Sequence, residues 1–272
     1  MISRVAGLTF LHLAPHPDDE SIGAVATLLA LTAAGHRVIN VACSLGRPAD
    51  AERRRAEVEA ACALAGFELA DTPPVGLSRH EDRVAAEREL VRIVGDLVAE
   101  RAVDVVVSPS PHDGHYGHEA VGRAARDVVA QAAGPRLWLW GLWADLPWPT
   151  LYFGFDAAAL DQALAVLSRH RGEIARNDYR EVLRGRATAN RVLGSERVFG
   201  WGSAMRQQPY AELLMEVAWR DGEWRTGGAR ELDPADPLAD APDEGAWRAV
   251  PIAWWLYGAS FFESSGRRVP PG

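Results

Sequence analysis

The chain has 272 residues, 48% of them hydrophobic and 24% charged, which is the composition of an ordinary folded protein, and this length allows one large α/β domain or a domain with an appended subdomain. The net charge of -8 argues against nucleic-acid binding, because affinity for phosphates depends on clustered positive charge. All 29 basic residues are arginine, which excludes a lysine nucleophile, a lysine Schiff base and the lysine of a P-loop.

The cysteines and the apolar segments indicate where in the cell the protein is expected. Cys43 and Cys62 are too few for a disulfide framework and lack the CxxC spacing of thiolate zinc sites. The residues after Met1 lead into a strand-like segment without a signal-peptide core, and no apolar run reaches the roughly 18 residues of a membrane span. We therefore expect a cytoplasmic protein with no membrane partner, in which both cysteines are reduced and buried.

Strands and helices are predicted to alternate over the first half of the chain. Apolar runs predict strands at 8–14, 38–43, 67–69 and 103–107. Helical periodicity predicts helices at about 22–35, 51–65, 81–100 and 117–133. Because parallel strands need crossover connections, this alternation predicts a three-layer, Rossmann-like α/β fold with a mostly parallel sheet and helices on both faces.

The pattern is looser in the second half. A strand is predicted at 137–143 and a helix at 156–175, followed by a less regular region. The segment 232–245 is acidic and rich in proline, which is typical of an exposed loop. From this change we predict a main domain at 1–215 and a divergent C-terminal extension, 216–272, packed on it.

Two polar clusters directly follow predicted strands, where an open parallel sheet forms its ligand crevice. The first is His16-Pro17-Asp18-Asp19-Glu20, and the second runs from His112 to His118. Imidazole and carboxylate groups are zinc ligands, and catalytic zinc sites typically use three of them. His16, Asp19 and a histidine of the second cluster supply such a set, and Asp18 is placed to act as a general base. A capped helix start would also account for the first cluster alone.

The segment Ala14 to Glu20 resembles the first motif of the LmbE-like, or PIG-L, family of zinc-dependent N-acetylglucosaminyl deacetylases. The segment 115–122 resembles the second motif of that family. Shorter similarities lie at 54–57, 64–66 and 143–147, so the resemblance covers roughly the first 155 residues, and a weak one lies at 210–212. The main domain is therefore expected to be the catalytic domain.

The resemblance implies a role for each residue that matches the motifs. His16, Asp19 and His118 would hold Zn²⁺ or another divalent metal. Asp18 would be the general base, and His115 would stabilise the oxyanion and protonate the leaving amine. Arg54 would bind substrate, although a solvated helix face accounts for it equally well.

The second motif departs from the family pattern. Tyr116 and Gly117 replace the usual Pro-Asp, so the carboxylate that orients the catalytic histidine is missing, and we expect Asp113 or another acid to hold a charged His115 in its place. The additional His112 leaves open whether it or His115 is catalytic, and whether His115 is instead a ligand.

The other histidines and the tryptophans are mostly expected to be structural. We expect this of His12, His36, His80 and His170, because histidine is often only a surface or a satisfied core residue. Trp143 and Trp148 lie where a strand reaches the predicted site, although core packing is the commoner use of tryptophan.

The resemblance implies a hydrolase that removes an acyl group from an N-acyl amino sugar, with a small-molecule N-acylated glycoside as substrate, in secondary or thiol-cofactor metabolism. Three alternatives stay open. They are an amidase of sugar-thiol conjugates, a metal-dependent hydratase on the same fold, and a non-catalytic sugar-binding relative, the last suggested by the missing Asp at position 117. A homo-oligomer is also left open.

Overall fold

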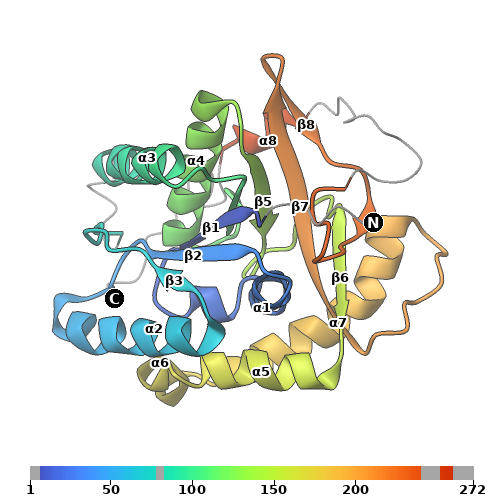
Figure 1. The fold of residues 1–272 in the computed structure, drawn as a ribbon, viewed down its shortest axis with the longest axis horizontal. Helices are drawn as coiled ribbons and strands as arrows, with labels where there is room; N and C mark the ends of the chain where they lie inside the picture. Colours follow the sequence, from blue (N-terminus) through green and yellow to red (C-terminus); the bar gives the residue numbers. More distant parts are fainter. Residues whose placement is uncertain (1–6, 78–82, 240–251, 260–272) are drawn as a thin grey trace.

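The computed structural model describes residues 7–77, 83–239 and 252–259, and its central element is a nine-stranded sheet (Figure 1). Five parallel strands lie in the order β3-β2-β1-β4-β5. They are β1 (Thr9–Ala14), β2 (Arg37–Ala42), β3 (Glu68–Leu69), β4 (Val105–Pro109) and β5 (Arg136–Trp140).

Four further strands extend the sheet beyond β5. They are β6 (Leu151–Phe155), β7 (Tyr210–Arg220), β8 (Glu223–Thr226) and β9 (Arg230–Glu231). β7 is antiparallel to β5, β6 and β8, whereas β9 is parallel to β6. The predicted α/β fold with a mostly parallel sheet is confirmed.

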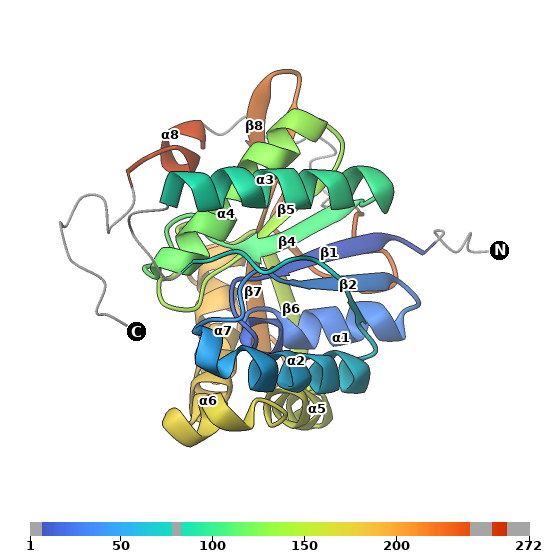
Figure 2. The same ribbon diagram turned by 90° about the vertical axis from the view of Figure 1, so that its left-hand side faces the viewer.

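Helices cover both faces of the sheet (Figure 2). One face carries α1 (Val25–Ala33), α2 (Ala51–Ala65), α5 (Ala157–Leu167), α6 (Arg171–Arg176) and α7 (Tyr179–Phe199). The other face carries α3 (Arg83–Glu100), α4 (Tyr116–Ala132) and the short α8 (Ala253–Leu256). None of the helices in the described part of the chain is long and apolar enough to cross a membrane.

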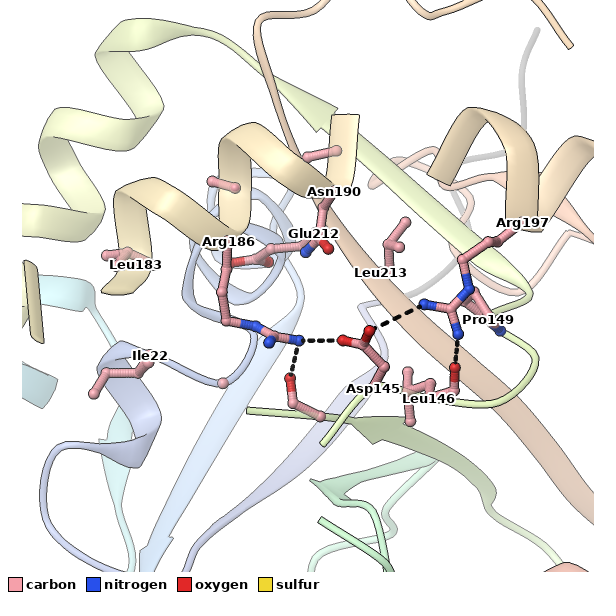
Figure 3. Close-up of a pocket in the computed structure, with 14 residues that line it drawn as sticks. Ile22, Asp145, Leu146, Pro149, Leu183, Arg186, Asn190, Arg197, Glu212 and Leu213 are labelled. Carbon is pink, nitrogen blue, oxygen red and sulfur yellow. Dashed lines mark hydrogen bonds and ion pairs between the residues drawn. The ribbon is translucent and has the colours of Figure 1, made fainter. Parts of the chain in front are cut away.

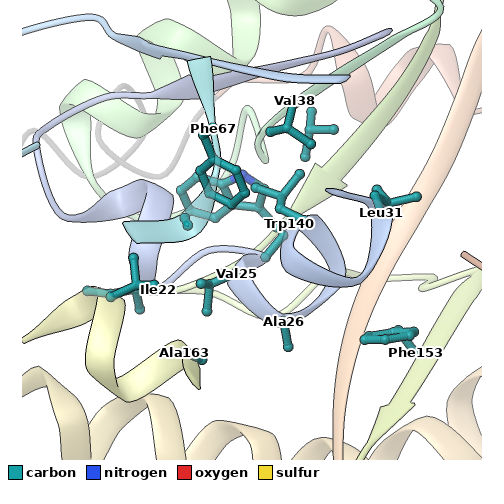
Figure 4. Packing of buried hydrophobic residues seen from close by; sticks show 14 of the residues in the cluster. Ile22, Val25, Ala26, Leu31, Val38, Phe67, Trp140, Phe153 and Ala163 are labelled. Atoms are coloured by element: carbon teal, nitrogen blue, oxygen red, sulfur yellow. The ribbon is translucent and has the colours of Figure 1, made fainter. Parts of the chain in front are cut away.

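Each face of the sheet buries its own hydrophobic cluster, because successive side chains of a strand point to opposite faces. On β5, Trp138 and Trp140 belong to the cluster beneath α1 and α2, part of which Figure 4 shows. Leu137 and Leu139 belong to the cluster beneath α3 and α4. This burial on both faces explains why the parallel strands are nearly continuous apolar runs in the sequence.

A buried carboxylate from β7 holds the start of α1. Ala24, the residue before this helix, makes no side-chain cap. Instead, Glu212 accepts hydrogen bonds from the backbone N–H groups of Ala26 (2.9 Å) and Thr27 (2.8 Å) and from the Thr27 hydroxyl (2.7 Å). The first N–H groups of a helix have no partner within the helix itself, and Glu212 supplies one. It therefore fixes the start of α1 just after the first polar cluster.

Three expectations for the second half of the chain are corrected. The predicted helix at 156–175 is two helices, α5 and α6, which are separated at Ser168–His170. The region expected to be less regular contains α7, whose buried face includes Gly194 and Ser195 and therefore gives only a weak apolar stripe. β6 and β7 were not predicted, and β7 carries two buried glutamates, which obscure its strand pattern.

The domain boundary expected at residue 215 falls within β7. Met215 and Glu216, on either side of it, both pair with β5, opposite Leu139 and Trp138. β8 and β9 follow the boundary and belong to the same sheet. His80, the first two residues of the helix expected at 81–100 and the part of the expected loop after residue 239 lie outside the described residues.

Candidate active site

The two polar clusters meet at the carboxyl ends of β1 and β4, which are neighbours in the sheet. The chain leaves β1 toward β2 on one side, and β4 lies on the other side. This is the point where the strand order reverses, and open α/β sheets bind their ligands there. The prediction that the clusters share one crevice is consistent with this topology.

Asp19 lies between two histidines, one from each cluster. Its Oδ2 atom is 3.2 Å from Nδ1 of His16, and its Oδ1 atom is 3.3 Å from Nε2 of His118. The backbone N–H of His16 also donates to Oδ2 (2.8 Å) and fixes the carboxylate. In a tetrahedral zinc site with bonds of about 2.0–2.1 Å, neighbouring ligand atoms are about 3.3 Å apart. Each of these two contacts is close to that spacing, and they involve different oxygen atoms of Asp19.

Asp113 orients His118 from behind. Nδ1 of His118 donates to Oδ2 of Asp113 (2.7 Å), whose other oxygen accepts the N–H groups of Leu142 (2.6 Å), Trp143 (3.1 Å) and Ala144 (3.3 Å). Burial alone would lower the pKa of His118, but the charges of Asp19 and Asp113 raise it to about 10. Because Nδ1 is engaged, Nε2 is the nitrogen presented to Asp19. Metal-binding histidines are commonly oriented by a carboxylate in this way.

His115 lies beside His16 and His118, and one nitrogen atom from each of the three rings lies within 4.8 Å of the others. The expectation that Asp113 would hold a charged His115 is wrong, because that carboxylate binds His118. Burial and the neighbouring histidines lower the pKa of His115 to about 3, so the imidazole is neutral at neutral pH. Its Nδ1 atom is buried and has no hydrogen-bond partner among the described residues.

The absence of the usual Asp at position 117 has a steric reason. A Cβ atom on Gly117 would lie 2.9 Å from Cε1 and 3.0 Å from Nε2 of His16. The first turn of α4 therefore approaches the His16 ring more closely than a side chain at position 117 allows.

The structure also separates His112 from His115. Nε2 of His112 donates to the carbonyl oxygen of Trp255 (2.5 Å), and the two rings lie 5.0 Å apart between centroids. His112 thus faces α8, and His115 is the one of the two that lies with His16 and His118. This placement favours His115 over His112 as the residue that acts at the site.

Asp18 is buried beside the cluster and has strained backbone geometry. Its φ angle of 130° is unusual for a residue other than glycine, and such strain is often found at functional sites. Its N–H donates to Oε2 of Glu20 (3.1 Å). Burial raises the pKa of Asp18 well above its usual value, and Asp19 raises it further, whereas Arg54 lowers it. A carboxylate with a raised pKa is a better proton acceptor.

Arg54 reaches the first cluster from α2. Its Nη2 atom donates to the carbonyl oxygen of Pro17 (3.1 Å) and lies 3.8 Å from Oδ1 of Asp18 and 3.5 Å from Oε1 of Glu173. The guanidinium is therefore part of the wall beside Asp18.

A second buried pair, which the sequence did not predict, supports Asp18. Nε2 of His170, in the turn between α5 and α6, lies 2.5 Å from Oε1 of Glu20, and both side chains are fully buried. Glu20 in turn holds the N–H of Asp18. His12 and His36 bind Asn40 and the carbonyl oxygen of Pro234, respectively.

A polar pocket lies between α7 and the loop after β5 (Figure 3). Arg186 donates to the carbonyl oxygen of Gly141 (3.0 Å) and to Asp145 (3.2 Å), and Arg197 lies 3.7 Å from Asp145 and donates to the carbonyl oxygen of Leu146. α7 therefore fixes the loop that carries Trp143, whose ring lies 6.4 Å from that of His115.

Comparison with known proteins places these residues in a family. Residues 11–129, which contain both polar clusters, match the family described as PIG-L: GlcNAc-PI de-N-acetylase. No curated protein matches the sequence.

Three solved structures have a similar fold. The zinc-inhibited form of teicoplanin deacetylase Orf2 is 16% identical, with 78% of this chain and 99% of that chain covered and a TM-score of 0.60. N,N'-diacetylchitobiose deacetylase from Pyrococcus horikoshii is 18% identical, with coverage of 78% and 84% and a TM-score of 0.59. The 4-carboxy-2-hydroxymuconate hydratase GalB from Pseudomonas putida KT2440 is 21% identical, with coverage of 78% and 97% and a TM-score of 0.57. Residues 11–129 therefore match a PIG-L, or LmbE-like, family domain, and the solved structures share the fold.

Proposed function

We propose that the protein is a metal-dependent hydrolase that removes an acyl group from an N-acyl amino sugar, with an N-acylated glycoside as its substrate. The observation that carries this proposal is the cluster of His16, His115 and His118, in which one nitrogen atom of each ring lies within 4.8 Å of the others, with Asp19 in contact with His16 and His118 and with Asp18 next to it in the chain. The family match and the deacetylases among the structural neighbours support it.

His16, Asp19 and His118 would hold the metal. A bound Zn²⁺ or similar cation supplies a Lewis acid toward the amide carbonyl and lowers the pKa of water at the site. Asp18 takes a proton from the attacking water, because it is a buried carboxylate next to a ligand. Once protonated, Asp18 returns this proton to the leaving amine.

His115 has a narrower role than the sequence predicted. Its low pKa leaves it without a proton to give at neutral pH, so it acts as a neutral N–H donor to the oxyanion. Arg54 lies beside Asp18, where it can bind a hydroxyl group of the sugar.

A hydratase is the second candidate function, because a hydratase is among the structural neighbours with a similar TM-score. The same metal and base would activate water for addition to a double bond. The two candidate functions differ in the substrate, an amide or a double bond, so an assay that offers both kinds of substrate can distinguish them.

The test is a panel of N-acyl glucosaminides and unsaturated dicarboxylic acids, incubated with protein that was purified without a chelator. We expect release of primary amine from the N-acyl glucosaminides, slowed by roughly a hundredfold or more in Asp18→Asn. Loss of the double-bond absorbance of the unsaturated acids, without amine release, would replace hydrolysis by hydration. Inactivity toward both groups by metal-loaded protein would contradict the proposal.

A further inference from the structure

Three half-exposed tryptophans lie in the loop after β5 and in α8, which are both connected to the candidate active site. Trp143, Trp148 and Trp254 are 47%, 45% and 63% exposed, although tryptophan has much apolar area to lose from water by burial. Trp148 and Trp254 lie 5.9 Å apart between ring centroids, with their planes at 79°. We call this pair the tryptophan corner.

Trp254 belongs to α8, which is firmly attached to the domain. Ile252 and Leu256 are fully buried in the cluster beneath α3 and α4. Arg126 of α4 donates to the carbonyl oxygen of Leu256 (2.6 Å), and His112 donates to that of Trp255 (2.5 Å). Figure 2 shows α8 at the edge of the sheet where the parallel strands end. Trp254 is therefore held in place while its side chain stays exposed.

Two short loops connect the tryptophan corner to the catalytic side chains. His112, which holds α8, is three residues from His115, so their Cα atoms are at most about 11 Å apart. Trp148 is five residues from Trp143, so their Cα atoms are at most about 18 Å apart. Trp143 itself stacks on His115, with ring centroids 6.4 Å apart and planes at 30°.

We propose that the tryptophan corner binds an aromatic aglycone of the substrate, so that the protein acts preferentially on amino sugars linked to an aromatic group. This inference rests on the proposed function, because it places the acyl group between Asp18 and His115. The aglycone is attached to C1, next to the C2 that carries the acylamino group, so an aryl aglycone extends away from Asp18 and His115 and can reach the exposed tryptophans. A flat aromatic ring that stacks on one tryptophan presents its edge to the other, and aromatic pairs favour both arrangements.

The test measures binding of deacylated glycosides by calorimetry, which requires no turnover. We expect wild-type protein to bind p-nitrophenyl β-D-glucosaminide about tenfold more tightly than methyl β-D-glucosaminide. Trp254→Ala and Trp148→Ala should each reduce this preference to about twofold while leaving the affinity for the methyl glycoside unchanged. Trp201→Ala is the matched control, because Trp201 is 87% exposed and follows the end of α7.

Equal affinity for the two glycosides, or an equal loss of preference in Trp201→Ala, would overturn the proposal. Tighter binding of chitobiosamine than of the aryl glycoside would show that the corner holds a second sugar and would overturn the aromatic assignment. Should Trp254→Ala fold poorly by circular dichroism, Trp148→Ala decides the matter. Amine release from methyl N-acetyl-β-D-glucosaminide tests the hydrolysis separately, because this substrate has no aromatic group to place in the corner.

Discussion

Replacing His115 with alanine should lower turnover by about two to three orders of magnitude while bound metal is retained, which is the typical size for the loss of one oxyanion donor. Burial and two neighbouring histidines hold the pKa of His115 at about 3, so it already donates as a neutral imidazole. Activity should therefore not fall between about pH 5 and about pH 8 through deprotonation of this residue. The measurements are kcat over this pH range and metal content.

His112→Ala is the control for this substitution. His112 faces α8, so its loss should leave kcat within about threefold of wild type and act mainly on the anchoring of α8. A large loss of turnover in His112→Ala but not in His115→Ala would contradict the role given to His115 and would require new roles for the residues of the second cluster. Loss of metal in His115→Ala would make this residue a ligand, which its distance from His16 and His118 also permits.

Asp18→Asn should lower turnover by roughly a hundredfold or more with nearly wild-type metal content, because it removes the base and not a ligand. Asparagine is the suitable replacement, since it preserves the shape of the side chain at a residue whose φ of 130° is already unusual. Turnover is measured on the substrate found in the amine-release panel, and metal is measured on the same preparation.

The two effects of Asp18→Asn must separate. Equal loss of metal and turnover would make Asp18 a ligand, and unchanged turnover would remove it from the mechanism. Asp50→Asn is a suitable comparison. Asp50 lies just before α2, where its carboxylate pairs with Arg47 and Arg53 and not with the residues of the cluster.

The elements that depend on local pattern were predicted well. α2 has the predicted limits, Ala51–Ala65, and ends at Gly66 with a left-handed φ of 75°. The continuous apolar runs predicted β1 and β4, because both faces of these strands are buried. The positions after these strands were enough to indicate where the two polar clusters would meet.

Contacts between distant segments could not be predicted from spacing. Asp113 lies two residues before His115 and five before His118, and the sequence favours the nearer partner. The helix start at Tyr116 instead turns His118 toward Asp113, and Gly117 lets His16 approach. The pair of Glu20 and His170 joins residues 150 positions apart, and neither residue carries a local signal of the other.

The central claim is that His16, Asp19 and His118 hold a catalytic metal, and elemental analysis of never-chelated protein tests it most directly. We expect close to one equivalent of divalent metal in the wild type and less than about a tenth of an equivalent in His118→Ala, because a catalytic site of three ligands does not survive the loss of one. Asp113→Asn should lie between them, since the amide must turn a donor toward either His118 or the backbone N–H groups. Less than about a tenth of an equivalent in the wild type, or wild-type metal in His118→Ala, would contradict the account.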